Sequence, residues 1–397
     1  MLEPNKGIFT YQIAREMSSE EHIRVIAPVP IAQRVPFLDS FRKHKIQRDV
    51  PQREKFEGIE VDHPAYHAIP KLGVLHHFAM YRALRPIVKA IHDVWHIDAV
   101  TCHWIFPDGV AVRRICEELD VPVMLTPLGT DLNQYGDFPI RAGIIKRALR
   151  KSDRVSVKSR EMYDRCLGLG VREERLALTP NGVDLATFNI LDREQARVKL
   201  DIRDDSHVIL FVGSLVPVKG IETLLRAFRL MVDKRERTSL KLYLIGTGYL
   251  EAPLRRLSMN LGLNDFVQFV GTVKHRDIVH WLNAADCLCL PSLSEGHPNV
   301  VMESLACGTP VVASAVGSIP DFITTASGRL TRPLDYGDLA VKLDQCLTAT
   351  YDRKIIRAHV QDFSWKECAR RYVSELSRLV EEKRMKAVRP STEKEDA

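Results

Sequence analysis

Short apolar runs rich in valine, isoleucine and leucine alternate with longer segments of helical periodicity along most of the chain. This alternation is typical of strand–helix–strand units that build a parallel sheet with helices on its faces. The runs form two series, over residues 22–28, 99–106, 121–129, 154–159 and 175–182, and then over 207–215, 240–248, 266–273, 286–293 and 309–317. We therefore predict two open, parallel sheets.

The segments between the runs have the period of amphipathic helices. We expect helices over residues 78–94, 109–119, 141–150 and 161–169, and others that start near Gly220, Tyr249, His275 and Pro298. Asn181-Gly182 is a turn signal, and the segment that follows it to residue 205 is polar with little apolar periodicity. We therefore predict an N-terminal domain over 1–182, a C-terminal domain over 183–382 and a disordered tail over 383–397.

Ligands of open α/β sheets bind beyond the carboxyl ends of the strands. Two such domains facing one another are therefore expected to enclose the site in the cleft between them. The last helical stretch, residues 365–383, is long and amphipathic. We expect it to reach back and brace the first domain.

The composition mainly excludes other classes of protein. The 397 residues are 45% hydrophobic and 27% charged, which is ordinary for a globular protein of two or three domains. The net charge of +6 is far below the concentrated positive field of a dedicated nucleic-acid binder. The 8 cysteines lack zinc spacing, and no apolar run reaches the ~20 residues of a membrane span. We expect a cytoplasmic protein with reduced cysteines and no nucleic-acid partner.

Two glycine-containing loops follow strands of the second series. Lys219 and Gly220 precede a helix, where an ammonium group and free N–H donors form a phosphate site, and a solvated lysine is the alternative. The Gly-Thr-Gly of residues 246–248 is part of a dinucleotide fingerprint, but Glu251 occupies the third glycine position. A tight strand-to-helix turn is the alternative there.

The stretch 291–303, with sequence PSLSEGHPNVVME, carries two carboxylates eight residues apart. Glu295 lies in the loop beyond a strand, Pro298 begins a helix, and Glu303 follows about one and a half turns further. We expect Glu295 to face the cleft and Glu303 to lie deeper along the helix, although a surface position explains Glu303 alone equally well. The N–H groups of residues 299–301 are expected to be free to hold a diphosphate.

Together these segments resemble the retaining glycosyltransferases of family 4, which have the GT-B fold. The resemblance rests on G-S-L-V-P-V-K-G at 213–220, G-T-G at 246–248, E-x7-E from Glu295 to Glu303, and the S-L-A-C-G-T-P-V-V-A that follows. P-N-G-V-D at 180–184 is similar to that family's interdomain segment, and H-W-I-F-P-D-G at 103–109 to members that make bacterial polysaccharides. The resemblance covers most of the chain and implies an α/β fold with two Rossmann-like domains facing across a cleft.

The resemblance also implies roles for individual residues. Lys219 is expected to neutralise the donor diphosphate, Glu303 to accept hydrogen bonds from the ribose, and Glu295 to hold the donor sugar as a catalytic residue. His103 is the catalytic candidate left on the acceptor side, with a satisfied buried histidine as the alternative. The other donor-side candidates are Gly7, Ser214, Gly246, Gly248, Gly296, His297, Pro298, Asn299 and Val300, and the acceptor-side candidate is Asp131.

The sequence departs from the family pattern at three places. Ser214 stands where many relatives have an arginine, so Lys219 carries more of the charge beside the diphosphate. Leu128 stands where many relatives have a histidine, which argues against an acid–base role in that loop. The chain also begins at what resembles the loop after the first strand of the sheet, with Gly7 in that loop. We expect the natural gene to start upstream and to supply this strand.

We therefore expect a retaining glycosyltransferase that moves a sugar from a nucleotide diphosphate sugar to a hydroxyl of a glycan or lipid-linked acceptor in cell-surface polysaccharide synthesis. The sequence contains no D-x-D, so we expect no metal and no cofactor besides the nucleotide sugar. Basic residues in 39–55 and 141–154 predict weak peripheral contact with anionic membrane. The rivals are a GT-B epimerase or hydrolase of sugar nucleotides, and a non-catalytic subunit that binds the donor.

Overall fold

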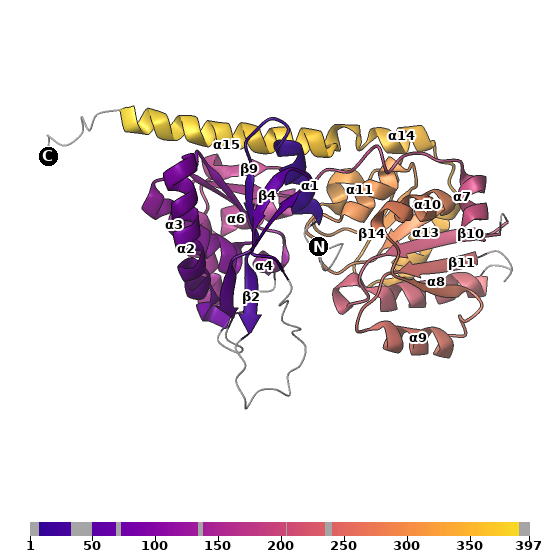
Figure 1. Cartoon of the computed structure of the whole chain (residues 1–397). Helices are drawn as coiled ribbons and strands as arrows, with labels where there is room; N and C mark the ends of the chain where they lie inside the picture. Colours follow the sequence, from indigo (N-terminus) through magenta and orange to yellow (C-terminus); the bar gives the residue numbers. More distant parts are fainter. Residues whose placement is uncertain are drawn as a thin grey trace. The chain divides into compact units, whose positions relative to one another are not determined.

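The computed structural model of the chain describes residues 8–32, 50–68, 73–133, 138–203, 205–234 and 240–388. The chain packs as two compact units, coloured along the sequence in Figure 1. Unit 1 consists of Met1–Lys158, Met162–Thr179 and Cys368–Ala397, and unit 2 consists of Ser159–Glu161 and Pro180–Glu367. Each unit therefore contains segments that are distant in sequence.

Unit 2 is built on a sheet of six parallel strands in the order β12-β11-β10-β13-β14-β15. The strands are β10 His207–Val212, β11 Leu240–Ile245, β12 Val267–Gly271, β13 Cys287–Leu290, β14 Val311–Ser314 and β15 Gly328–Thr331. The chain fills one half of the sheet outward from β10 and then returns to start the other half at β13. This reversal is a topological switch point, beyond which α/β proteins bind their ligands.

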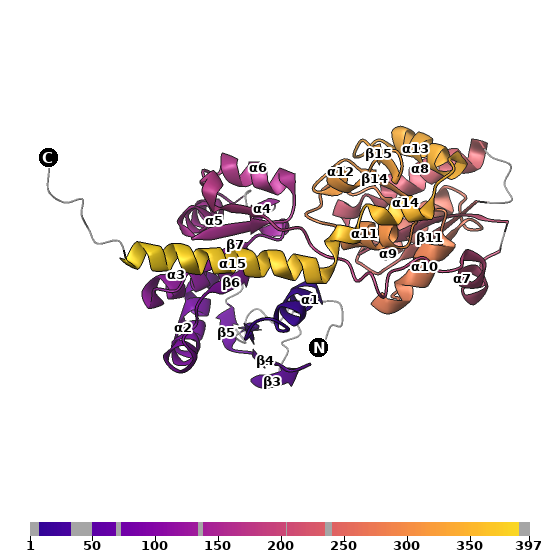
Figure 2. The ribbon, with the colours of Figure 1, turned by 90° about the horizontal axis from the view of Figure 1, so that it is seen from above.

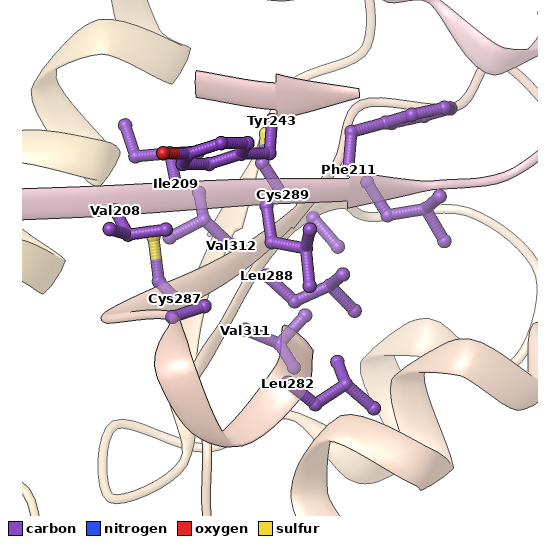
Figure 3. Packing of buried hydrophobic residues seen from close by; sticks show 14 of the residues in the cluster. Val208, Ile209, Phe211, Tyr243, Leu282, Cys287, Leu288, Cys289, Val311 and Val312 are labelled. Atoms are coloured by element: carbon purple, nitrogen blue, oxygen red, sulfur yellow. The ribbon is translucent and has the colours of Figure 1, made fainter. Parts of the chain in front are cut away.

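Helices cover both faces of this sheet (Figure 1). They are α7 Arg193–Lys199, α8 Ile221–Lys234, α9 Glu251–Asn260, α10 Ile278–Ala284, α11 Asn299–Ala306, α12 Ile319–Phe322, α13 Tyr336–Thr348 and α14 Arg353–Ala358. Strands buried on both faces read as continuous apolar runs, which is why β13 has the sequence Cys-Leu-Cys-Leu. Figure 3 shows β10, β11, β13 and β14 contributing side chains to one apolar core.

The described residues of unit 1 form three smaller sheets. Four parallel strands form the sheet β6-β7-β8-β9, and the others have the orders β1-β4-β3 and β2-β5. The strands are β1 Arg24–Ile26, β2 Val29–Ala32, β3 Arg53–Phe56, β4 Ile59–Asp62, β5 Ala65–Ala68, β6 Val100–His103, β7 Val123–Thr126, β8 Arg154–Val157 and β9 Leu176–Leu178. The helices are α1 Ile8–Met17, α2 His76–Trp95, α3 Val110–Leu119, α4 Thr130–Asn133, α5 Pro139–Lys151 and α6 Arg160–Gly168.

Helix α15, Trp365–Val388, lies against the β6-β7-β8-β9 sheet of unit 1 through its residues beyond Glu367 (Figure 2). Arg154 at the start of β8 pairs with Glu375 and Glu382, at 3.3 and 2.8 Å. The predicted return of this helix to the first half of the chain is therefore present.

Three features differ from the sequence-based expectation. The tail does not begin at residue 383, because α15 continues to Val388. The segment after residue 182 has little apolar periodicity, yet Phe188 is buried in the core of unit 2 and α7 follows it. The antiparallel hairpin of β3 and β4 was not predicted, because its residues alternate with charged ones and lack a continuous apolar run.

Candidate functional site

Two loops meet at the switch point of unit 2. One follows β10 and carries Lys219, and the other follows β13 and carries Glu295. Gly220 has φ +63°, and a Cβ at this position would collide with the carbonyl oxygen of Pro291. Only glycine therefore allows the two loops to approach this closely.

The predicted donor residues Lys219 and Glu295 form an ion pair. Nζ of Lys219 donates to Oε1 of Glu295 at 2.6 Å, and the hydroxyl of Ser292 donates to the same oxygen at 2.6 Å. Glu295 has only 9% of its side chain exposed, against 22% for Lys219. The carboxylate is thus held by two donors, and the ammonium is the more accessible partner.

The Gly-Thr-Gly loop packs against the loop after β10. Gly246 has φ +126°, and a Cβ there would collide with the carbonyl of Gly213, next to the predicted Ser214. The N–H of Leu215 donates to the carbonyl of Thr247 at 2.9 Å, and Gly248 leaves no room for a side chain beside Leu215. The interpretation as a tight strand-to-helix turn therefore describes this loop, which also supports the lysine loop from behind.

The start of α11 offers fewer free donors than predicted. Pro298 is the N-cap residue, one position before the first helical residue, and its carbonyl accepts the N–H of Val301 at 3.0 Å. The predictions that Pro298 begins the helix and that the N–H of Val301 is free are therefore wrong: the helix begins at Asn299. The amide of Asn181 donates to Oδ1 of Asn299 at 3.2 Å, which ties the Pro-Asn-Gly-Val-Asp segment to this helix.

Gly296 and His297 are fixed by the segment after β14. The N–H of Ser318 donates to the carbonyl of Gly296 at 3.2 Å, and its hydroxyl lies 3.1 Å from Nδ1 of His297. Backbone atoms of the predicted phosphate loop are thus held in place by an element that the sequence did not single out.

Glu303, on α11, is buried with 8% of its side chain exposed, which excludes the surface alternative. Its Oε1 lies 2.7 Å from Nε2 of His275, in the turn after β12. Sequence reasoning missed His275, because nothing in the chain around it marks a contact with a residue 28 positions away.

On the acceptor side, the predicted Asp131 is a buried carboxylate that joins two loops of unit 1. It accepts N–H groups of Ile105 at 2.8 Å, and of Leu128 and Gly129 at 3.0 Å each. Burial raises its pKa, although these hydrogen bonds act in the opposite direction. Asp131 therefore organises the loops after β6 and β7.

His103 ends β6 and stacks on Tyr372 of α15, with ring centroids 5.9 Å apart and planes inclined by 14°. Burial, and secondly the charge of Lys158, lower the pKa of His103 to about 3. The imidazole is therefore neutral at physiological pH, which supports the interpretation as a packed histidine over that of a proton carrier.

Asp108 was missed by the sequence analysis, although it lies in the H-W-I-F-P-D-G motif. Burial, with a smaller contribution from the charge of Asp131, raises its pKa to about 6. Within the described part of the chain, its carboxylate has a hydrogen bond only with its own backbone N–H. The turn that carries it begins at Trp104, whose φ of +79° is strained for a tryptophan.

Two predictions about site residues find no direct answer in the described structure. Gly7 lies outside the described residues. Among the described residues no group of three or more His, Cys, Asp or Glu side chains gathers as a metal site, and the expectation of no metal stays a prediction.

The parallel sheet of unit 2, with a lysine, glycine turns and two buried carboxylates at its switch point, defines a nucleotide-binding α/β enzyme. The chain belongs to glycosyltransferase family 4: residues 9–187 match "Glycosyltransferase Family 4", and residues 192–361 match "Glycosyl transferases group 1". It is therefore a glycosyltransferase. The alternatives of an epimerase, a hydrolase or a non-catalytic subunit are not favoured.

Curated relatives share this class. A D-inositol 3-phosphate glycosyltransferase of Frankia alni is 34% identical over 303 residues, which is 71% of this chain and 74% of the relative. A protein of Bacillus subtilis named as a teichuronic acid biosynthesis glycosyltransferase, TuaC, is 27% identical over 370 residues, covering 91% and 89% of the two chains.

Solved structures confirm the GT-B fold. Sucrose-phosphate synthase of Thermosynechococcus elongatus has a TM-score of 0.76 at 21% identity, over 95% of this chain and 94% of the other. Anabaena HepE in complex with UDP has a TM-score of 0.72 at 18% identity, over 95% and 97%. No helix in the described ranges is both long and apolar enough to cross a bilayer.

Proposed function

We propose that unit 2 binds a nucleoside diphosphate sugar and that a hydroxyl of a glycan or lipid-linked acceptor receives the sugar with retention of configuration. The observation that carries this proposal is the Lys219–Glu295 pair at the switch point. A partly accessible cation lies there beside a carboxylate, which is the pairing that a diphosphate and an adjoining sugar require.

In this proposal the lysine turns from Glu295 toward the diphosphate as the donor binds, assisted by the N-terminus of α11. Glu295, still held by Ser292, then accepts hydrogen bonds from the sugar hydroxyls. Glu303 accepts those of the ribose. Charge at the leaving group is met by protein donors, which is the main contribution to such catalysis.

The proposed transfer uses no protein nucleophile. The bond between the anomeric carbon and the diphosphate oxygen breaks, and the acceptor oxygen bonds to the same face of that carbon. The acceptor proton passes to the departing phosphate oxygen, so the products are a glycoside and a nucleoside diphosphate. The low pKa of His103 supports a mechanism in which this histidine does not take up the acceptor proton.

The test is a calorimetric titration with a panel of UDP- and GDP-sugars, followed by product analysis with and without acceptor. We expect one donor to bind and to be consumed only in the presence of an acceptor. UDP-sugars are the first choice, because the Anabaena neighbour was solved with UDP. Consumption of the donor alone would instead indicate an epimerase or hydrolase, and binding without any turnover a non-catalytic subunit.

We further propose that α5 contacts anionic membrane. Phe138 and Ile140 are exposed at its start, at 56% and 69%. The exposed basic residues Lys146, Arg147, Arg150 and Lys151 follow on the same helix. Each such charge contributes about 1 kcal/mol near an anionic surface.

The basic patch is smaller than the sequence indicates. Arg154 is buried and paired with Glu375 and Glu382, so it does not belong to this surface. In the other basic segment, Arg53 pairs with Asp62 at 2.7 Å, and residues 39–49 lie outside the described residues. Cosedimentation with anionic vesicles at low salt, absent for neutral vesicles and lost in Arg147→Glu/Lys151→Glu, would support the contact. Equal sedimentation with both vesicle types would refute it.

A further inference from the structure

A histidine contacts the buried carboxylate that is proposed to bind the ribose. His275 lies in a short turn, His275–Asp277, between β12 and α10, and Glu303 lies on α11. Nε2 of the imidazole and Oε1 of the carboxylate are 2.7 Å apart. One third of the histidine side chain is exposed, and Glu303 is nearly enclosed.

The imidazole is held from two further directions. The ring of Phe188 packs against it with centroids 5.1 Å apart, and the carboxylate of Asp184 acts on it electrostatically. Burial lowers the pKa of His275, but the hydrogen bond and charge of Glu303, with the charge of Asp184, outweigh burial and raise it above the ordinary value. The imidazole is therefore suited to donate to Glu303.

Asp184 and Phe188 both belong to the segment by which the chain enters unit 2. Asp184 is itself fixed, because its carboxylate accepts the N–H groups of Ala186 and Thr187, both at 3.1 Å. This segment contains the Pro-Asn-Gly-Val-Asp motif, whose Asn181 also contacts Asn299 at the start of α11. Thus the motif reaches the proposed donor site at two points, both within unit 2.

We propose that His275 is a positioning residue for nucleotide recognition: it occupies Oε1 of Glu303 and so directs the second carboxylate oxygen to the ribose hydroxyls. The inference rests on the proposed function, because it assumes that Glu303 contacts the ribose. A carboxylate with one oxygen already held has fewer accessible orientations, so the hydrogen bonds of its other oxygen to a ligand require less ordering on binding.

A purely structural role makes a different prediction. If His275 only satisfies a buried carboxylate, its loss destabilises the protein and weakens every nucleotide equally. If it aims Glu303 at the ribose, its loss removes selectively the preference for nucleotides with intact ribose hydroxyls. The ratio of affinities for ribo- and deoxyribonucleotides therefore separates the two roles.

The experiment compares wild type, His275→Ala, His275→Gln and Glu303→Gln by calorimetry with UDP and GDP and with their 2′-deoxy and 3′-deoxy counterparts. We expect wild type to prefer the intact ribose by about tenfold, which corresponds to 1.4 kcal/mol. The preference should fall toward one in His275→Ala and in Glu303→Gln. It should largely return in His275→Gln, whose side-chain amide can still donate a hydrogen bond.

His280→Ala is the matched control. This histidine lies on the neighbouring α10 and meets Lys199 at the surface, so the variant should keep the wild-type ratio. A double variant, His275→Ala with Glu303→Gln, should lose no more selectivity than either single variant, because both changes remove the same contact.

The pH dependence gives a second readout. The charged groups that face His275 are Glu303 and Asp184, and both favour its protonated form. A protonated imidazole donates a charge-assisted hydrogen bond, which is stronger than that of the neutral ring or of an amide. The wild-type preference for intact ribose should therefore weaken, without being lost, as the pH rises through the raised pKa of His275, and it should not change with pH in His275→Gln. A folded His275→Ala that keeps the wild-type ratio would overturn the positioning role alone. Failure of wild type to bind either nucleotide would overturn the proposed function as well.

Discussion

At the scale of single residues, the two members of the Lys219–Glu295 ion pair are expected to affect different steps: Lys219 nucleotide binding, and Glu295 turnover. Lys219→Ala removes the cation proposed for the diphosphate, and Glu303→Ala removes the acceptor proposed for the ribose. A charge-assisted hydrogen bond contributes about 1.5 to 3 kcal/mol, so each variant should bind nucleotide roughly ten- to a hundredfold more weakly. Calorimetry with UDP or GDP measures this. Lys241→Ala, which loses only a surface contact with the carbonyl of Asp265, is the control.

Glu295→Gln should behave differently. Its loss of charge frees Lys219 from a partner at 2.6 Å, so nucleotide affinity should stay or improve. Turnover should fall, because the contacts proposed for Glu295 orient the reacting sugar. Steady-state kinetics alongside calorimetry would show a lower kcat with unchanged nucleotide affinity. Equal losses in kcat and affinity would contradict the role given to this carboxylate.

Asp108 predicts a pH effect on stability. Its folded pKa of about 6 lies above the ordinary value of 3.8, so the folded state holds a proton that the unfolded state has released between these two values. Stability should therefore fall as the pH rises from about 4 to about 6, by about 2 kcal/mol from this residue. Denaturant unfolding of wild type and Asp108→Asn over this range measures it, and the variant should be the more stable at pH 7. Parallel pH profiles would show that Asp108 does not contribute.

Sequence reasoning found residues of the site that belong to continuous motifs, and it missed those that act through a partner. Lys219 and Glu295 are recognisable because each stands in a loop between an apolar strand and a helix. His275 and Asp108 gain their properties from neighbours distant in sequence and from burial, which a linear pattern does not contain. The same reason explains why His103 was expected to be catalytic: its low pKa comes from burial and, secondly, from the charge of Lys158.

At the scale of elements, β8 shows how a strand in which polar and apolar residues alternate can be buried on both faces. Val155 and Val157 face the apolar core of unit 1, while Arg154, Ser156 and Lys158 bond to other groups. Helix α15 supplies most of the partners: Tyr372 contacts Ser156 and Lys158, and Arg154 pairs with two glutamates. A strand that reads as half exposed is covered by a helix more than 200 residues later in the chain.

Tyr372→Phe tests how much the contacts of α15 with β8 stabilise the protein. Lys158 is 3% exposed, and among the described residues its ammonium would then keep only the carbonyl of Thr179, at 3.0 Å. A buried group deprived of a hydrogen-bond partner costs about 1 to 3 kcal/mol, and more when it is charged. Denaturant unfolding should show at least this loss. Lys158→Met combined with Tyr372→Phe should recover part of it, because no buried charge remains. Additive losses in the double variant would contradict the proposed coupling.

The strands of the second series were predicted to within a few residues, because apolar runs bounded by glycine or proline leave little choice. The edge strand β15 and the hairpin of β3 and β4 were not predicted. Their residues are only partly apolar, and they form strands because a neighbouring strand offers hydrogen-bond partners. Such dependence on pairing is expected of edge strands and short hairpins.

At the scale of the whole molecule, each unit has its own apolar core, so unfolding should not be a single transition. A nucleotide bound at unit 2 stabilises that unit by about 2.7 kcal/mol at a hundredfold excess over Kd. For a unit of this size the corresponding transition should rise by roughly 5 to 10 °C. Differential scanning calorimetry with and without UDP or GDP measures this, and hydrogen exchange assigns the transition to a unit. A single transition that shifts as a whole would contradict independent units.

Because the residues of α15 beyond Glu367 belong to unit 1, the two units cannot complete their folding in the order in which they are synthesised. Domains usually complete their folding in the order in which they leave the ribosome. Here residues 368–388 are needed by unit 1, yet they are synthesised after Pro180–Glu367. At 5 to 20 residues per second that delay is roughly 10 to 40 s. Throughout it the ammonium of Lys158 and the polar face of β8 lack Tyr372 and the two glutamates. The half of the enzyme that is translated first is therefore the half that is completed last.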